Sequence, residues 1–188
     1  MRQGELFALT WADFDFEFLT IRINKTHSYV KDIESNKRVN YVTNTKTKKS
    51  NRIIPMAQRT RNILMNHLRE QKIMLFKIGI IQSDETLVFG TPVNTSLDSS
   101  NVLQELKKVY ASIGINDKTF HDLRHTYATR LFELGEPAKT VQELLGHSNV
   151  SQTLGTYTHV LEQQKIKTAS LIDALYDPPQ KTNVISIG

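Results

Sequence analysis

The feature that most constrains the fold is a change in hydrophobic period along the chain. Residues 14–30 alternate between apolar and polar side chains, which is the period of a β-strand. Residues 39–43 and 52–55 have the same strand character, and from residue 57 onward apolar residues recur at helical spacing. We therefore expect an α+β fold that is mainly α, with a small three-stranded antiparallel sheet beside a helical domain.

Six segments have the apolar spacing of helices. Gly135 and Gly146 stand where helices should stop, and residues 84–99 are expected to form a long loop. The polar residues 44–51 read as the tip of a hairpin. The expected helices are residues 2–10, 57–76, 101–113, 121–134, 137–145 and 160–176.

Basic residues are concentrated in one third of the chain. The whole sequence of 188 residues has 24 Lys and Arg against 19 Asp and Glu, a net charge of +5. Residues 21–62 alone hold eleven basic and two acidic residues, so the excess positive charge lies in the predicted sheet and hairpin. Such a local excess indicates a polyanionic partner.

The composition also excludes several classes of protein. The chain has no cysteine, which rules out disulfides, Cys-ligated zinc and a thiol nucleophile. No apolar run approaches the length needed to cross a membrane, and the first residues lack the apolar stretch of a signal peptide. We expect a soluble cytoplasmic protein with no membrane partner.

Residues 121–125, His-Asp-Leu-Arg-His, place unusual charge at the start of a predicted helix. His121, Arg124 and His125 share one face, and cations in a first turn oppose the helix macrodipole, whereas a bound anion would be stabilised there. The plainer alternative is a solvated face with one structural histidine. Zinc binding by His121 and His125 is a weaker alternative, because no glutamate follows the first histidine and no third ligand is evident. We therefore expect no metal site.

A single tyrosine, Tyr157, stands in polar surroundings. It lies between threonines and beside Gly155, whereas Tyr110 and Tyr127 fall within helical periodicity and fit core packing better. We expect the hydroxyl of Tyr157 to be reachable from solvent.

Three motifs in this order resemble the C-terminal half of tyrosine recombinases, the integrases of phages and conjugative transposons. They are His-x-Leu-Arg-His at 121–125, Leu-Leu-Gly-His at 144–147 and Thr-Tyr-Thr-His-Val at 156–160. Residues 2–6, Arg-Gln-Gly-Glu-Leu, resemble the family's first arginine motif, and residues 45–55 resemble its catalytic-lysine hairpin. Residues 11–15 resemble the element after the arginine motif, so the similarity extends over about residues 1–175.

The resemblance implies an enzyme of site-specific DNA recombination that integrates or excises a mobile element by phosphotyrosyl transesterification. A tyrosine oxygen conserves the energy of the broken phosphodiester in a covalent link, and arginines can clamp the phosphate bidentately. The reaction would use no metal and no cofactor. The implied catalytic residues are Tyr157 as nucleophile, Arg2 and Arg124 as phosphate ligands, Lys46 as general acid, His121 as an aid to proton transfer at the tyrosine, and His147 as a hydrogen-bond donor to a phosphate oxygen.

Three further family positions are expected to support this set. Glu5 should orient an arginine or its helix, and His125 and His159 should pack or steady the catalytic groups. Lys48 and Lys49 share the hairpin tip with Lys46, and a register shift of two residues would exchange their roles.

Among the basic residues of the sheet region, some are expected to contact DNA phosphates. These candidate DNA-binding residues are Lys25, Lys48, Lys49 and Arg52.

The implied partner is double-stranded DNA, on which the intact protein would self-associate, as a tetrameric synapse. We expect residues 1–176 to form an N-terminally truncated catalytic domain and residues 177–188 a flexible tail. Leu6, Leu9 or their neighbours should then leave an apolar patch uncovered, so that the chain self-associates or is marginally stable. The helix at 160–176 should pack within its own chain or against a partner.

Other functions share these residues. A chromosome-dimer resolvase or a type IB topoisomerase-like enzyme would use the same chemistry. A catalytically inactive DNA-binding module would need only the basic segment.

Overall fold

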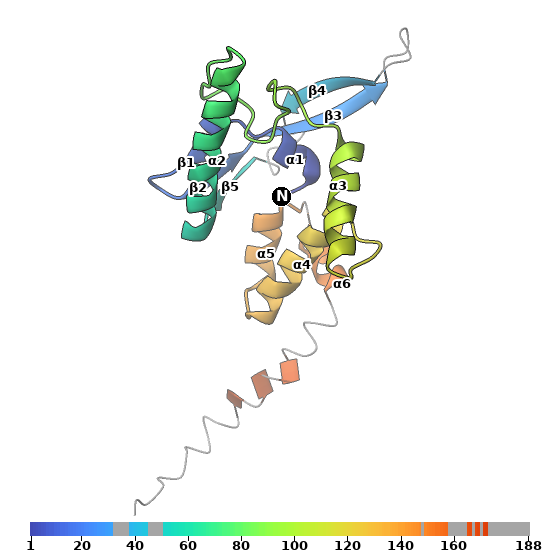
Figure 1. The fold of residues 1–188 in the computed structure, drawn as a ribbon. Coiled ribbons are helices and arrows are strands. Elements are labelled where there is room, and N and C mark those ends of the chain that lie inside the picture. The colour runs from blue at the N-terminus through green and yellow to red at the C-terminus, as the bar shows by residue number, and fades with distance from the viewer. Residues whose placement is uncertain are drawn as a thin grey trace, which may run out of the picture.

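A computed structural model of the chain describes residues 1–31, 38–44, 51–147 and 149–157, and six helical positions between residues 165 and 172. Its elements are α1 (Gln3–Phe7), the 3-10 turn η1 (Trp11–Asp13), β1 (Phe14–Asp15), β2 (Thr20–Ile23), β3 (Lys25–Lys31), β4 (Arg38–Asn44), β5 (Arg52–Pro55), α2 (Gln58–Lys77), α3 (Ser99–Ser112), α4 (Phe120–Glu133), α5 (Ala138–Leu145) and α6 (Val150–Thr156). Figure 1 shows the strands and α2 on one side of the N-terminus and helices α4 to α6 on the other. The mainly helical α+β fold is thus confirmed.

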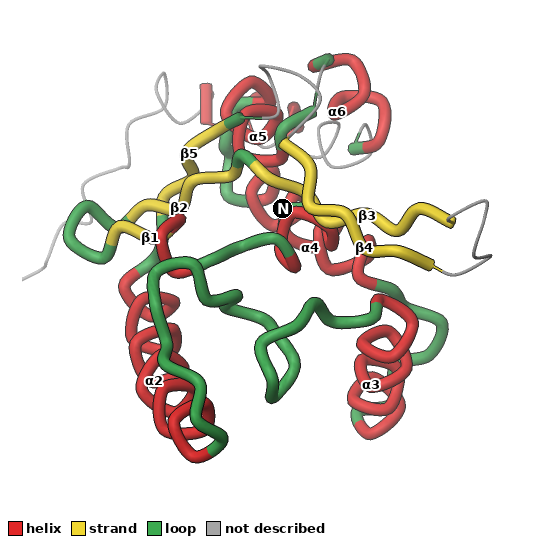
Figure 2. Tube along the Cα trace, turned by 90° about the horizontal axis from the view of Figure 1, so that it is seen from above, coloured by secondary structure: helices red, strands yellow, loops and turns green. Residues whose placement is uncertain are grey.

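The strands form two antiparallel ladders rather than one sheet. The three-stranded sheet has the order β1-β2-β5, with Ile21 opposite Ile54 in the β2/β5 register. The other ladder pairs β3 with β4, and Figure 2 shows it projecting away from the three-stranded sheet. One continuous strand over residues 14–30 was therefore a wrong prediction.

A turn after β1 interrupts the strand that the sequence predicted over residues 14–30. The side chain of Asp15 accepts hydrogen bonds from the backbone N–H groups of Glu17 and Phe18, and Leu19 has a positive φ of 52°. Such aspartate turns compete with strand pairing. The chain therefore reverses direction here, although the sequence continues to alternate between apolar and polar residues.

The first hydrophobic cluster joins the sheet to α2. Trp11 lies within it, and its indole Nε1 donates to the side chain of Gln71 of α2 at 2.7 Å. Leu9 is only 3% exposed and Leu6 packs against the cluster, so an uncovered apolar patch does not lie at these two leucines themselves. The buried members are Leu9, Trp11, Ile21, Ile23, Met56, Leu64 and Val88.

The second hydrophobic cluster joins α4, α5 and the end of α6. Its buried members are Ala128, Phe132, Val141, Leu145 and Tyr157. Helix α1 lies between the two hydrophobic clusters. We call this region, between the sheet and helices α4 and α5, the polar seam.

Close packing against β3 fixes α1 in place. A Cβ atom on Gly4 would lie 2.5 Å from the carbonyl oxygen of His27 and 2.7 Å from the Thr26 hydroxyl, so only glycine permits this approach. On its other side, Phe7 meets Phe120 of α4 edge to face at 6.0 Å. These contacts set the positions of Arg2 and Glu5.

The helices agree with the predicted ones to within a few residues, with three exceptions. The first helix ends at Phe7 because the next residues pair with the 84–99 loop: the Val88 N–H donates to the Leu9 carbonyl. Helix α6, capped by the Asn149 side chain, was not predicted. Of the predicted helix at 160–176, the described positions are helical, and the rest lies outside the described residues, as does the predicted tail at 177–188.

No helix in the described part of the chain combines the length and apolarity needed to span a membrane.

Candidate active site

Three arginines from different elements meet at the C-terminal end of α5. Arg52 Nε donates to the Leu144 carbonyl at 3.2 Å, Arg124 Nη2 to the Leu145 carbonyl at 2.6 Å, and Arg2 Nη2 to the Gly146 carbonyl at 3.2 Å. The last carbonyls of a helix have no partners within it and carry the negative end of the macrodipole. The end of α5 therefore gathers three cations that would otherwise repel one another.

The backbone at Gly146 is shaped for this role. Gly146 has a positive φ of 67°, and the backbone N–H groups of Gly146 and His147 donate hydrogen bonds to carbonyls of α5. A Cβ atom at Gly146 would lie 2.6 Å from Arg52 Nη1. The glycine thus ends the helix and leaves room for the guanidinium group above it.

Glu5 balances part of this positive charge. Its carboxylate is 2% exposed and accepts from Arg52 Nη1 at 3.0 Å and Nη2 at 2.8 Å. It also accepts from the backbone N–H of Arg2 at 2.7 Å and from Arg2 Nη1 at 3.3 Å. Burial opposes ionisation, but the hydrogen bonds from Arg52 and Arg2 outweigh it and lower the pKa of Glu5 from 4.5. The expected role of Glu5 in orienting an arginine agrees with this geometry.

Arg124 is buried without a full set of partners. Arg124 is 6% exposed, and its Nη1 atom has no hydrogen-bond partner among the described residues. Burial, followed by the charge of Arg2, lowers the pKa of Arg124 to about 10. A buried guanidinium with an unpaired donor is costly, so the site is built to receive an anion.

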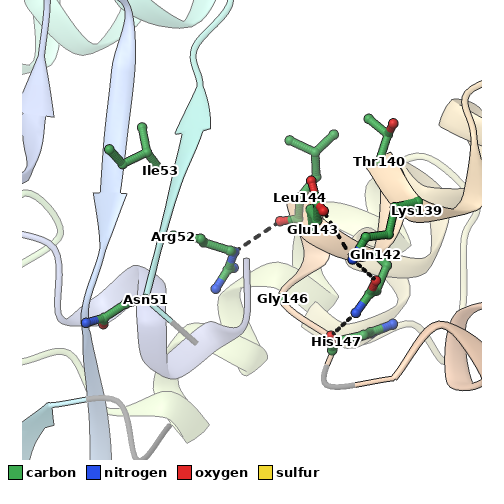
Figure 3. Close-up of a pocket in the computed structure, with 10 residues that line it drawn as sticks. All are labelled: Asn51, Arg52, Ile53, Lys139, Thr140, Gln142, Glu143, Leu144, Gly146 and His147. Atoms are coloured by element: carbon green, nitrogen blue, oxygen red, sulfur yellow. Dashed lines mark hydrogen bonds and ion pairs between the residues drawn. The ribbon is translucent and has the colours of Figure 1, made fainter. Parts of the chain in front are cut away.

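His147 lies beside these arginines at the edge of a cavity. The cavity, of about 420 Å³, separates β5 from α5, and Figure 3 shows Arg52 reaching across it toward Leu144 while His147 lies below Gln142. The Gln142 side chain donates to the His147 carbonyl at 2.8 Å and fixes the turn. Burial, then the charges of Arg124 and Arg2, lower the pKa of His147 to about 4, so the ring is neutral near pH 7.

Tyr157 directly follows α6 and is buried, not reachable as its polar neighbours suggested. It is 3% exposed and packs on Phe132 of α4 with ring centroids 5.1 Å apart. Its hydroxyl shares a hydrogen bond of 2.8 Å with Nδ1 of His125. The polar sequence around it misled because the burying groups come from α4 and α5, far away along the chain.

His121 lies outside this contact. It is exposed, and its ring meets the ring of His125 edge to face with centroids 4.4 Å apart. The residue that touches the tyrosine oxygen is therefore His125, for which the sequence predicted only packing or support.

Two of the expected DNA-binding residues, Lys25 and Arg52, have acidic partners within the protein. The ammonium of Lys25 pairs with the buried carboxylate of Asp13 at 2.9 Å and donates to the Thr10 hydroxyl at 3.0 Å. The Arg52 side chain is 8% exposed in its pair with Glu5. Both side chains point inward, because each neutralises a buried acid that the sequence placed far from it.

Lys46, Lys48, Lys49 and His159 lie outside the described residues.

Across the described ranges, no group of three or more acidic or histidine side chains is arranged to hold a metal ion.

Sequence comparison places the chain among known proteins. The model of the phage integrase family matches residues 1–164. The chain is 38% identical to a tyrosine recombinase XerC-like protein of Caldanaerobacter subterraneus subsp. tengcongensis, over 94% of this chain and 46% of that protein. It is 33% identical to the integrase of Staphylococcus phage L54a, over 87% of this chain and 45% of that protein. The chain thus spans about half the length of the curated relatives it matches.

Comparison with solved structures agrees. The Tn1549 transposon integrase in complex with circular intermediate DNA is 27% identical, with a TM-score of 0.65 over 84% of this chain and 51% of that one. The XerA recombinase, 23% identical with a TM-score of 0.64 over 89% of this chain and 53% of that one, shares the fold. With a family model that covers most of its length and the arginine, histidine and tyrosine motifs in one seam, the chain belongs to the phage integrase family.

Proposed function

We propose that this chain is the catalytic part of a site-specific DNA recombinase that cleaves and rejoins strands through Tyr157. The observation that carries the proposal is Arg124, a guanidinium that is 6% exposed, lacks a partner for Nη1 among the described residues and lies near a buried tyrosine hydroxyl. A phosphate diester would supply the missing counter-charge.

In the proposed reaction, the Tyr157 oxygen attacks the scissile phosphorus and the bond to the 5′ oxygen breaks. The product is a 3′-phosphotyrosyl link, which preserves the phosphodiester energy for rejoining. Arg124 and Arg2 stabilise the charge that develops on the non-bridging oxygens, since they are preorganised by the Leu145 and Gly146 carbonyls.

His147 and Lys46 complete the proposal. Once a phosphate is bound, the neutral His147 ring can donate one hydrogen bond to it, and Lys46 would protonate the leaving 5′ oxygen. Lys46 rests on the hairpin resemblance alone.

The finer parts of the proposal concern the whole protein. Because two matched relatives are named integrases, of phage L54a and of ICEBs1, we propose integration or excision of a mobile element. We also propose double-stranded DNA as the partner, with self-association on it as a tetramer. The DNA complex of the Tn1549 integrase supports the first of these partners.

A covalent-capture experiment tests this function. The full-length protein is incubated with a pool of duplexes of randomised sequence, each nicked near its centre so that a cleaved piece diffuses away. Wild type should retain DNA through detergent denaturation and enrich a sequence, whereas Tyr157→Phe should retain none while still binding DNA. Absence of any retained DNA with wild type, together with salt-sensitive binding, would favour a DNA-binding module instead.

A further inference from the structure

The contact between His125 and Tyr157 goes beyond the roles assigned so far. Among the described residues, His125 is the only hydrogen-bond partner of the Tyr157 hydroxyl, at 2.8 Å from Nδ1. A general base must lie within hydrogen-bond distance of the proton that it removes, and His125 meets this condition while the exposed His121 does not contact the hydroxyl.

The surroundings of Tyr157 make such a partner necessary. The residue is 3% exposed and its ring packs against Phe132, so bulk water does not reach the phenol freely. A buried phenol that attacks phosphorus must pass its proton to a neighbouring side chain.

We propose that His125 is a further catalytic residue, the direct proton acceptor of Tyr157 in strand cleavage and its proton donor in rejoining. The inference rests on the proposed function and specifies one of its steps. As the bond from the Tyr157 oxygen to phosphorus forms, the O–H bond breaks and the proton moves to Nδ1 of His125. The bond from phosphorus to the 5′ oxygen breaks in the same step, and that oxygen takes a proton from the general acid.

His121 has a secondary place in this scheme. Its ring is exposed and meets the ring of His125 edge to face, with centroids 4.4 Å apart, so a positive charge on His121 opposes protonation of His125. The scheme requires His125 to be neutral with its proton on Nε2 before cleavage.

The electrostatics of the pair set the protonation states before cleavage, a neutral imidazole and a protonated phenol, and the proton moves to His125 only as the Tyr157 oxygen bonds to phosphorus. Burial, followed by the charge of His121, lowers the pKa of His125 below 6.5, so the ring is neutral near pH 7. Burial raises the pKa of Tyr157 above 10, against an opposite effect of Arg124, so the phenol does not ionise unaided. The titratable and charged groups around His125 are His121, Asp122 and Arg124 of α4, His147 after α5, Tyr157 after α6, and Tyr110, Lys118, Arg130 and Glu133 around the adjoining cavity.

The first test measures cleavage rates on a nicked duplex enriched by wild type in the covalent-capture experiment. In His125→Asn, the amide keeps a polar group near the hydroxyl but cannot take a proton. We expect cleavage to slow about 100-fold or more at neutral pH. The wild-type rate should reach a plateau above the pKa of His125, whereas the variant's rate should keep rising into the alkaline range. His121→Asn should slow cleavage less, and Glu105→Gln, on the exposed surface of α3, should match wild type.

A second substrate separates the base from the acid. A sulfur atom in place of the bridging 5′ oxygen makes the leaving group independent of protonation. It should restore cleavage by Lys46→Ala and leave His125→Asn slow. Rescue of His125→Asn by this substrate would overturn the proposal, as would an unchanged rate and pH profile in that variant. No covalent adduct from wild type would instead contradict the proposed function and this step with it.

A measurement without variants covers the case in which His125→Asn does not fold. The imidazole ¹⁵N shifts of His125 in the wild-type protein report which nitrogen carries the proton. We expect an unprotonated Nδ1 and a protonated Nε2 near pH 7. A protonated Nδ1 would make His125 a donor to the tyrosine and would overturn the proposal.

Discussion

Replacement of Arg52 by alanine tests whether this residue holds the seam together or contacts DNA. In the wild type, Arg52 makes two hydrogen bonds to Glu5 with both side chains under 10% exposed, and a third to the Leu144 carbonyl. Removal of one partner from a buried ion pair costs about 3–5 kcal/mol. We expect the lower end, about 3 kcal/mol, because Arg2 remains bound to Glu5.

The assay is unfolding in urea, followed by thermal unfolding. For a chain of this size, about 3 kcal/mol corresponds to a decrease of about 6–12 °C in Tm. Lys108→Ala is the matched control, since its pair with Glu105 is about 70% exposed on both sides and should be worth less than about 1 kcal/mol. Arg52→Lys should fall between wild type and alanine, because lysine keeps the charge and loses the planar fork.

DNA binding gives the outcome that would refute this reasoning. If Arg52→Ala lost less than about 1 kcal/mol and lowered the salt dependence of DNA affinity by about one phosphate contact, Arg52 would be the DNA ligand that the sequence first indicated.

Three further predictions concern the same seam. Glu5→Gln should remove a loss of stability at acid pH. Because the pKa of Glu5 is lowered in the folded state, the wild type loses stability as the pH falls below 4.5. Urea midpoints measured across about pH 3–6 should show this decrease in the wild type and not in the variant. His147→Asn should remove the pH dependence of stability between about pH 4 and 6.5. In this range the unfolded state binds a proton at His147 and the folded state does not, so the stability of the wild type should rise with pH. An equal rise in the variant would contradict the assignment. Gly146→Ala should destabilise by about 2 kcal/mol or more, because φ is 67° and the new methyl group would meet Arg52 Nη1 at 2.6 Å; unchanged urea unfolding would count against the account of the helix end.

Local signals in the sequence predicted most of the secondary structure. Strand β5 begins and ends where the alternation does, and Gly135 and Gly146 end their helices with positive φ, as expected. The sequence did not predict helix α6, because its seven residues contain Gly155 and have no apolar stripe. The Asn149 cap and packing against α5 stabilise this helix. Its existence depends on tertiary contacts, which periodicity does not report.

The site shows the same division between local and distant information. The motif order brought Arg2, Arg124, His147 and Tyr157 into one candidate set, and the structure brings them together. Sequence could not show that Lys25 and Arg52 face inward, because a paired lysine or arginine has the same letter as a solvated one and its buried acid lies elsewhere. It also could not show that His125, rather than His121, touches the phenol, since residues one turn apart lie on the same face of a helix and the sequence does not show which turn meets Tyr157.

The most direct test of the central claim is to identify the residue that carries DNA after cleavage. The trapped adduct is digested with nuclease and protease, and the modified peptide is sequenced by tandem mass spectrometry. We predict a nucleotide attached through its 3′ phosphate to the oxygen of Tyr157. A nucleotide on another residue, or a 5′ linkage, would contradict the account.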